Sequence, residues 1–346
     1  MFASRALGGV RHRVLVTPVR QFQNVRRPPP GYELQRFPPK TYGPNKEQYQ
    51  RFEQNRHGHD LRKRRRLIFI GTGTAIFGGY YVTHLETVPV SGRRRFIDIT
   101  PKQEEALAKL SYQEVMQQFG SAILPSWHPY TRFVKKVAER IIRVSGMESL
   151  NWEFYVIKSD EKNAFVLPGG KVFVFTGILP VVGNEGRSHG MAAVLGHEIA
   201  HQLARHSAEK LSFAKIIFVG QLLISTVIDP SVLFNRLFYN LGIMMPFSRK
   251  CETEADFIGL QLMAQACYDP REAIKMWTRM EQLSHNAVKG DAQSPQFLST
   301  HPSHKNRVAA LTKELPDALS KRAASDCAKT DLWANMFANA TRWVKW

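Results

Sequence analysis

The sequence predicts an α+β fold that is mostly helical, with a small β-sheet and one N-terminal transmembrane helix. Three observations support this prediction. Residues 101–120 and 128–146 have helical periodicity and end at a glycine. Residues 152–158 and 171–179 are aromatic and β-branched runs around a Pro-Gly-Gly turn, which is a hairpin signal. Residues 67–83 form a run of 17 residues without a charge, near the lower limit for crossing a bilayer.

Residues 1–60 are predicted to be a mitochondrial presequence followed by a basic, proline-rich matrix segment. The first 20 residues contain four arginines and no acidic residue, with hydrophobic residues between them, which is typical of a mitochondrial transit peptide. The stretch "RRPPPGYELQRFPPKTYGPNKEQ" is rich in proline and polar residues and predicts no folded structure. A disordered basic arm is the alternative, and mitochondrial import does not exclude it.

The formal net charge of +19 at pH 7 would by itself fit a nucleic-acid-binding protein. Most of this charge, however, lies at the front of the chain. Residues 1–66 contain 16 Lys and Arg against 4 Asp and Glu, a net charge of +12. We therefore expect no nucleic acid among the partners of this protein.

The charge-free segment 67–83 is predicted to be a transmembrane helix in the mitochondrial inner membrane, with the lipid bilayer as a partner. A basic cluster at residues 62–66 precedes the segment and, by the positive-inside tendency, stays on the matrix side. This orientation places the domain that follows in the intermembrane space. Three arginines at 93–95 on the far side weigh against the orientation, and a buried core helix is the alternative to a span.

The predicted strand before the Pro-Gly-Gly turn has Asn163 and Ala164 near its edge. An edge strand can pair with an extended substrate, so that affinity comes from main-chain hydrogen bonds and specificity stays loose. These two residues are therefore candidates for substrate binding. The alternative is a structural hairpin that contacts no substrate.

The segment "VLGHEIAHQLARH", residues 194–206, carries a His-Glu-x-x-His motif among apolar residues. Because His197 and His201 are four residues apart, both imidazoles lie on one face of a helix and can reach one zinc ion. Glu198 lies beside that face, where it could accept a proton from a water activated by the metal and return it to the leaving amine. That is the chemistry of peptide-bond hydrolysis. A helix that carries two histidines by chance is the alternative.

A catalytic zinc site usually has three protein ligands, so a third ligand is expected downstream. His206 does not fit the metzincin arrangement, whose spacing and glycine are missing here. In "SRKCETEAD", Glu252 and Asp256 are four apart on a predicted helix. One carboxylate could bind the metal, and the other could accept the N–H of a ligand histidine. Glu254 points away from Glu252 around the helix, and we expect it to be solvated.

Two apolar runs, 212–228 and 232–247, lie between the His-Glu-x-x-His motif and Glu252. They predict a helical hairpin over 212–247, because the chain must leave the site and return to it. Charged and polar residues within the runs favour packing on the catalytic core or dipping into the membrane interface over a full double span. If the hairpin dips into the interface, the substrates are expected to be membrane proteins cut close to the surface.

The segment "THPSHKNR", residues 300–307, offers two further candidates. Either His301 or Arg307 could face the oxyanion of the tetrahedral intermediate, whose charge needs a positioned donor. The proline after His301 marks a turn, and His304 and Arg307 are expected to begin the next helix.

Residues 316–346 predict a C-terminal amphipathic helical tail that docks on the domain, with a membrane-surface helix or a regulatory contact as alternatives. The three cysteines, Cys251, Cys267 and Cys327, have no zinc-finger spacing. Their number allows at most one disulfide, and the sequence does not assign their redox state.

These motifs, in this order over residues 100–315, resemble the membrane-associated zinc metallopeptidases of the HtpX and CAAX-prenyl-protease type. The length, the single N-terminal membrane segment and "SRKCETEAD" are most similar to the Oma-type proteases of the mitochondrial inner membrane. The resemblance implies a gluzincin-like metallopeptidase domain with one zinc ion per chain. It implies that the zinc ligands are His197, His201 and Glu252, and that Glu198 is the general base. It also implies that Asp256 contacts one of the ligands and not the metal itself.

The resemblance further implies a zinc-dependent endopeptidase that cleaves membrane proteins in quality control and stress-responsive processing. Its expected partners are membrane-protein substrates and the bilayer, and a homo-oligomer is left open. A prenyl-protease-like enzyme of the endoplasmic reticulum would share the site but should have more membrane spans. A non-enzymatic membrane scaffold would retain the fold without turnover.

Overall fold

The computed structural model describes residues 46–183, 187–224, 245–288, 296–301, 307–325 and 327. The chain divides into two compact units, Met1–Ile70 and Gly71–Trp346. Three predicted features therefore lie partly or largely outside the described residues. They are the first 45 residues of the leader, residues 225–244 of the apolar hairpin, and the tail beyond Cys327.

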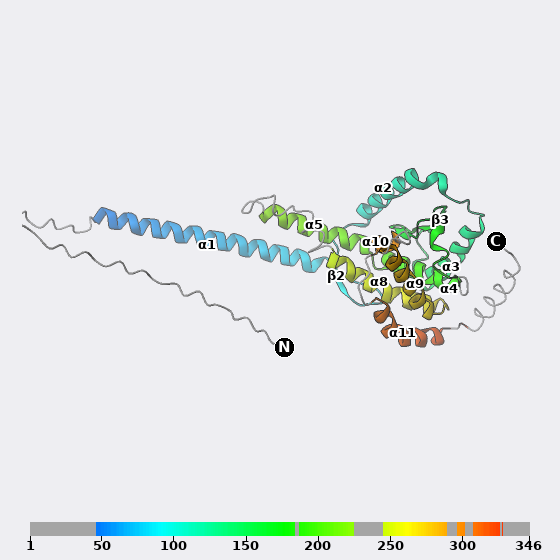
Figure 1. Ribbon diagram of the computed structural model, residues 1–346. Coiled ribbons are helices and arrows are strands. Elements are labelled where there is room, and N and C mark those ends of the chain that lie inside the picture. Colours follow the sequence, from blue (N-terminus) through cyan, green and yellow to red (C-terminus); the bar gives the residue numbers. More distant parts are fainter. Residues whose placement is uncertain are drawn as a thin grey trace, which may run out of the picture. The chain divides into compact units, whose positions relative to one another are not determined.

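Helix α1 (Lys46–Thr83) contains the segment that was predicted to cross a membrane (Figure 1). The side chains from Leu67 to Thr83 are all exposed. Among the described residues, however, no helix combines the length and the apolar composition that crossing a membrane needs. The predicted transmembrane helix at 67–83 is therefore not supported. The physical reason is that four glycines and three threonines among its 17 residues lower the mean hydropathy of the segment.

A short hairpin joins α1 to the rest of the domain. Its strands β1 (Leu85–Thr87) and β2 (Arg94–Phe96) are antiparallel. Two of the three arginines that weighed against the predicted membrane orientation are engaged by acidic side chains. Arg93 forms ion pairs of 2.6 Å with Glu209 and with Glu254, and the buried Arg95 lies 3.7 Å from Glu86.

Helices α2 (Pro101–Phe119) and α3 (Pro129–Ser145) confirm the two helices predicted from periodicity. Each begins with a proline, whose fixed φ suits the first helical turn. Thr100 and Gln103 form a capping box at the start of α2, which satisfies backbone donors that no helical carbonyl can reach. Helix α3 ends at Gly146 with a φ of 74°, a left-handed conformation that glycine adopts without strain.

The sheet has the strand order β3-β5-β4, with β3 at Glu153–Ile157, β4 at Ala164–Leu167 and β5 at Lys171–Phe175. The Pro-Gly-Gly turn joins β4 to β5 as an antiparallel hairpin, whereas β3 pairs with β5 in parallel. The prediction that residues 152–158 and 171–179 pair with each other as a hairpin was therefore wrong. The reason is that the short strand β4 lies between those runs in the sequence and takes the place beside the turn.

Both faces of β5 are covered. Val172 and Val174 pack in the main core with α3 and α4, while Phe173 and Phe175 face an aromatic layer under α2. Alternate side chains of a strand point to opposite faces, so a strand buried on both sides reads as a continuous apolar run. The sheet is therefore a middle layer between α2 and the helices that carry the motifs.

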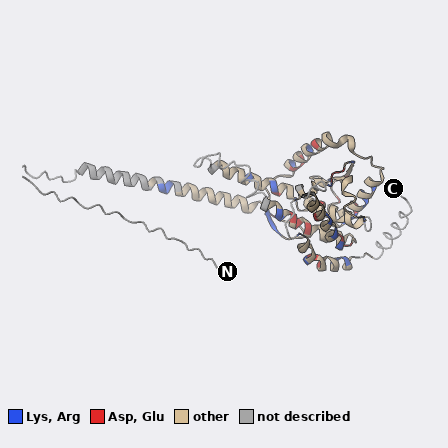
Figure 2. Ribbon diagram, in the orientation of Figure 1, with Lys and Arg blue, Asp and Glu red and all other residues tan. Residues whose placement is uncertain are grey.

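Helices α4 (Arg187–Leu203) and α8 (Met245–Gln265) form the centre of the domain. They cross at Gly196 and Gly259, where a Cβ atom on Gly259 would lie 2.8 Å from the backbone nitrogen of His197. Only glycine permits so close an approach of two backbones. This crossing brings acidic positions of α8 against the His-Glu-x-x-His turn of α4. Figure 2 shows acidic positions in red on α8, in the middle of the domain.

The remaining described helices surround this pair. They are α5 (His206–Ile224), α9 (Arg271–Val288), α10 (Gln296–Thr300) and α11 (Arg307–Ala324). The two described ends of the predicted apolar hairpin meet, because the rings of Phe213 and Phe247 stack with centroids 4.3 Å apart. The stack therefore joins the beginning of α5 to the beginning of α8, while α5 itself continues to Ile224.

A disulfide joins Cys267, just after α8, to Cys327, just after α11. The bridge closes a loop over a sequence separation of 60 residues. Cys251, by contrast, is a buried thiol. The pairing that the sequence left open is thus between the second and third cysteines.

Replacing both bridged cysteines by serine is expected to lower the free energy of unfolding by about 2–4 kcal/mol, because the unfolded chain regains the entropy that the closed loop removes. Urea denaturation followed by circular dichroism measures this change. Wild type in reducing agent should lose the same amount, whereas the double variant should not respond to reductant. An equal response of both proteins would show that another effect of reduction is being measured.

Candidate metal centre and active site

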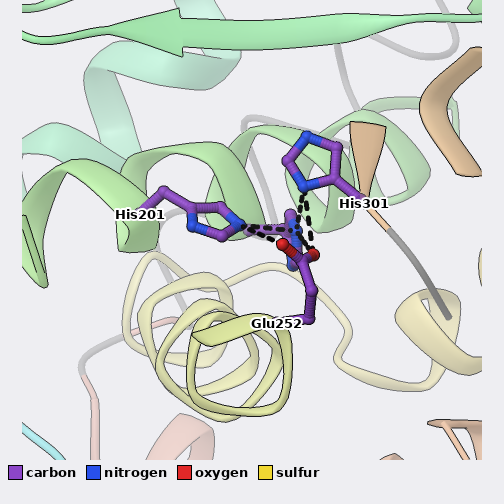
Figure 3. Close-up of side chains that lie close together, drawn as sticks. His201, Glu252 and His301 are labelled. Atoms are coloured by element: carbon purple, nitrogen blue, oxygen red, sulfur yellow. Dashed lines mark hydrogen bonds and ion pairs between the residues drawn. The ribbon is translucent and has the colours of Figure 1, made fainter. Parts of the chain in front are cut away.

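Four potential ligand residues converge at the centre of the domain (Figure 3). His197 and His201 come from consecutive turns of α4, Glu252 comes from α8, and His301 directly follows α10. One ligand atom of each residue lies within 4.8 Å of those of the other three. The Nε2 atoms of His197 and His201 are 3.1 Å apart, and Glu252 Oε2 lies 3.2 Å from His197 Nε2. The structure therefore brings the three predicted ligands together and adds His301 to them.

The donor set of this centre fits a metal ion. Imidazole and carboxylate groups in a buried cluster are ligands that zinc and similar cations bind. Glu252 Oε1 is buried and makes no hydrogen bond to a described residue, although it lies 3.6 Å from His201 Nε2. A buried polar atom without a hydrogen bond is costly, and a cation between these atoms would satisfy it.

Burial and hydrogen bonding set the charges of the ligand side chains. Burial lowers the pKa of His201 well below its ordinary value, which favours the neutral imidazole that binds metals. Burial opposes protonation of His197 as well, but its hydrogen bonds to Asp256 and Glu252 outweigh this effect and raise its pKa. Burial also opposes ionisation of Glu252, yet hydrogen bonds, first that from His197, lower its pKa. The carboxylate therefore stays charged, and a metal ion competes with a proton for His197.

Glu198 lies beside the four ligand residues. Its side chain is buried, and its Oε1 atom is 3.3 Å from His301 Nε2. Burial raises the pKa of the Glu198 carboxyl to about 7. A carboxyl group with a pKa near neutrality can both accept and return a proton at physiological pH.

His301 was predicted as an oxyanion contact, and the structure places it between the acidic groups of the centre. Its Nδ1 atom is 3.0 Å from Glu252 Oε2 and 3.3 Å from His197 Nε2, while its Nε2 atom faces Glu198. His304 lies outside the described residues.

Arg307 lies behind His197, where it holds Asp256. Asp256 Oδ1 is 2.9 Å from His197 Nδ1, and Arg307 Nη2 donates to the same oxygen at 2.6 Å. The Arg307 guanidinium lies 3.3 Å from the ring centroid of Trp277, and the residue is only 1% exposed. This arrangement fits a support for Asp256, which orients the histidine, rather than a contact with substrate.

Glu254 is buried, which corrects the prediction that it is solvated. Only 8% of the residue is exposed, because the β1–β2 hairpin and the start of α5 cover this face of α8. Glu254 Oε2 lies 3.0 Å from His206 Nε2, and Arg93 Nε donates to the same oxygen at 2.9 Å. His206 lies in turn behind His201, with their Nδ1 atoms 2.8 Å apart. Sequence reasoning missed these partners, since nothing local connects Arg93 to a motif 161 residues away.

Strand β4 borders the active site with its unpaired edge. It pairs with β5 on one side and with no second strand among the described residues. The backbone of Val166 in β4 lies close enough to Glu198 to affect the pKa of its carboxyl, and β4 packs against α4, so the strand lies beside the catalytic centre. Asn163 is buried just before the strand, where its side chain accepts from the Ala164 N–H at 3.0 Å. Ala164 is fully buried and pairs with Val174 of β5.

Comparisons with known proteins agree with this geometry. The model of peptidase family M48 matches residues 130–315. The chain is 50% identical over 257 residues to the mitochondrial metalloendopeptidase OMA1 of Schizosaccharomyces pombe, covering 74% of each protein. It is 39% identical over 266 residues to the protein of the same name from Saccharomyces cerevisiae, covering 73% of this chain and 76% of that protein.

A human relative, named metalloendopeptidase OMA1, mitochondrial, is 36% identical over 284 residues, which cover 78% of this chain and 53% of the human protein. The matched family range contains both α4 and α8, and hence His197, Glu198, His201 and Glu252. The chain therefore belongs to peptidase family M48, as a metalloendopeptidase of the mitochondrial Oma type.

Proposed function

We propose that the chain is a zinc-dependent endopeptidase of the mitochondrial inner membrane that cleaves membrane proteins in quality control and stress-responsive processing. The observation that carries this proposal is the convergence of His197, His201 and Glu252 beside the buried carboxyl of Glu198. Zinc bound there would activate a water molecule and polarise the scissile carbonyl. Three protein ligands, with His301 close by, suit a catalytic zinc site.

The protein's own groups have distinct parts in this proposal. Glu198 accepts a proton from the attacking water and returns it to the leaving amine. His301, 3.3 Å from Glu198, is placed to donate to charge that develops on the substrate. Asp256 and Arg307 keep His197 in one orientation. The edge of β4 next to Glu198 is suited to pair with an extended substrate backbone.

One feature supports action at a membrane, and another supports a domain that lies in an oxidising compartment. Helix α1 exposes large apolar side chains from Leu67 to Val82, and α5 exposes Phe218 and Val219. Apolar patches of this kind mark interaction with a membrane or with other proteins. The disulfide between Cys267 and Cys327 suits a compartment outside the reducing cytosol. We therefore propose that the domain faces the intermembrane space, with membrane-protein substrates and the bilayer as partners and a homo-oligomer as a further prediction.

Removing the metal tests the catalytic part of the proposal. The full chain purified in detergent is expected to contain about one zinc per chain and to cleave an unfolded membrane protein. The chelator 1,10-phenanthroline should abolish cleavage and zinc should restore it, because in this proposal the metal lowers the pKa of the attacking water. Cleavage that continues after the zinc is gone, or a wild-type protein without zinc, would make the zinc peptidase proposal untenable.

Fractionation of mitochondria tests the location. The protein is expected to stay with the membranes after carbonate extraction and to become accessible to added protease only when the outer membrane is ruptured. Release into the carbonate supernatant, or protection until both membranes are opened, would contradict the proposed location or orientation respectively.

A further inference from the structure

We propose that His206 is a positioning residue that fixes the ring orientation and tautomer of the metal ligand His201, through a buried chain that continues to Glu254 and Arg93. This inference deepens the proposed function and rests on it. It assigns a role to three buried or half-buried groups that the reaction itself does not use.

The two rings of His201 and His206 meet at their Nδ1 atoms. His201 directs its Nε2 atom into the metal centre, 3.6 Å from Glu252 Oε1, and its Nδ1 atom outward, 2.8 Å from His206 Nδ1. Two imidazole nitrogens at this distance form a hydrogen bond only when one of them carries a proton. A ring that binds a metal through Nε2 keeps its proton on Nδ1. His201 is therefore the donor and His206 the acceptor.

The rest of the chain has a matching polarity. A neutral His206 that accepts at Nδ1 carries its own proton on Nε2, and that atom lies 3.0 Å from Glu254 Oε2. Glu254 is held by Arg93 Nη2 at 2.6 Å and by the hydroxyl of Ser91. Each hydrogen bond thus has one donor and one acceptor. His201 donates to His206, His206 donates to Glu254, and Arg93 holds the Glu254 carboxylate.

The other histidine ligand, His197, is held in a similar way, but with no residue between it and the carboxylate. His197 Nδ1 meets Asp256 directly, and Arg307 holds Asp256. Both ligand histidines therefore end on a carboxylate and arginine pair, and His206 bridges the longer gap behind His201. Such outer partners raise the basicity of the ligand and hold its ring.

The turn between α4 and α5 brings His206 to this position. Arg205 has a φ of 46°, a left-handed conformation that is uncommon for a residue other than glycine. Its guanidinium is held by Glu104 at 2.9 Å and by Glu86 at 3.1 Å. The turn returns the chain at once, so that the first residue of α5 lies behind the second histidine of the motif.

A second metal ion is the alternative, because ligand atoms of His206, Glu209 and Cys251 also lie within 4.8 Å of one another. Two contacts argue against it. Arg93 binds both oxygens of Glu209 at 2.6 Å and so already supplies the positive charge. Both nitrogens of His206 are engaged, one by His201 and one by Glu254. The cluster is therefore complete as a hydrogen-bonded chain.

Asparagine and glutamine at position 206 each keep only one of the two hydrogen bonds of the His206 ring, which join it to His201 and to Glu254. Asparagine can present its oxygen where Nδ1 lies and keep the bond from His201, whereas glutamine can reach Glu254 but leaves His201 without its acceptor. His206→Gln is expected to weaken zinc binding by about 10- to 100-fold, the usual effect of losing an outer partner. His206→Asn should stay within a few-fold of wild type. Ser207→Ala changes the exposed neighbouring residue and is expected to have no effect.

Competition with a chromogenic chelator measures zinc affinity on the purified full chain, and thermal unfolding in EDTA reports the fold without metal. The positioning role of His206 is supported if His206→Gln weakens zinc binding, His206→Asn retains it, and all variants unfold at similar temperatures in EDTA. Glu254→Gln is a second variant in case position 206 does not tolerate change, with an expected loss of about tenfold.

Other outcomes overturn the inference. Wild-type zinc affinity in His206→Gln and Glu254→Gln would show that His201 needs no outer partner. Equal losses in the asparagine and glutamine variants would exclude the acceptor role. Two zinc ions per wild-type chain would favour the second metal site instead. A wild-type chain that binds no zinc would overturn the proposed function, and the role of His206 with it.

Discussion

Glu198→Gln is expected to lower kcat for peptide hydrolysis by about 10²- to 10⁴-fold, while the protein keeps its zinc. The Glu198 carboxyl is buried, lies 3.3 Å from His301 and has a pKa that burial raises to about 7. Glutamine keeps the size of the side chain and one of its oxygens, but its neutral amide does not act as a base. Cleavage assays and zinc analysis on one preparation measure both effects.

A matched substitution on the surface provides the control. Glu105→Gln changes an exposed residue of α2 and is expected to leave kcat and zinc content at their wild-type values. If Glu198→Gln cleaves as fast as wild type, Glu198 is not the base. If the variant loses its zinc together with its activity, Glu198 supports the metal centre, and the general-base role needs another residue.

Features that depend on short stretches of sequence were predictable. The starts of α2 and α3 follow from capping residues and proline, and the end of α3 follows from Gly146. A spacing of four residues placed His197 with His201, and Glu252 with Asp256, on common helix faces. The structure brings these two faces together at the crossing of α4 and α8.

Features that depend on distant contacts were not predictable. The parallel pairing of β3 with β5 is decided by how the chain returns between them, and strand patterns alone do not contain that information. Glu254 was expected in solvent because one helix considered alone has an outer face, but that face of α8 is covered by Arg93 from the β1–β2 hairpin and by His206 of α5. The membrane segment is not supported for a different reason, since a charge-free run is a weaker requirement than an apolar one, and no helix among the described residues meets the stronger requirement.

Glu252→Gln is expected to weaken zinc binding by roughly 10²- to 10³-fold, and so to abolish cleavage when zinc is limiting. Zinc sites with four ligands bind with apparent free energies of about 10–16 kcal/mol. One ligand thus averages about 2.5–4 kcal/mol, and each 1.4 kcal/mol is a factor of about ten in affinity. Glutamine keeps the shape of the side chain, but its neutral amide is a much poorer ligand than a carboxylate.

The pair of Glu198→Gln and Glu252→Gln distinguishes a base from a ligand, because the same chemical change at two buried positions of one centre should have opposite effects on zinc. Chelator competition measures the affinity, and excess zinc should restore part of the activity of Glu252→Gln but none of that of Glu198→Gln. Zinc bound to Glu252→Gln as tightly as to wild type would mean that the third ligand is another group. His301 would then be the candidate, since its Nδ1 atom lies only 3.0 Å from Glu252 Oε2.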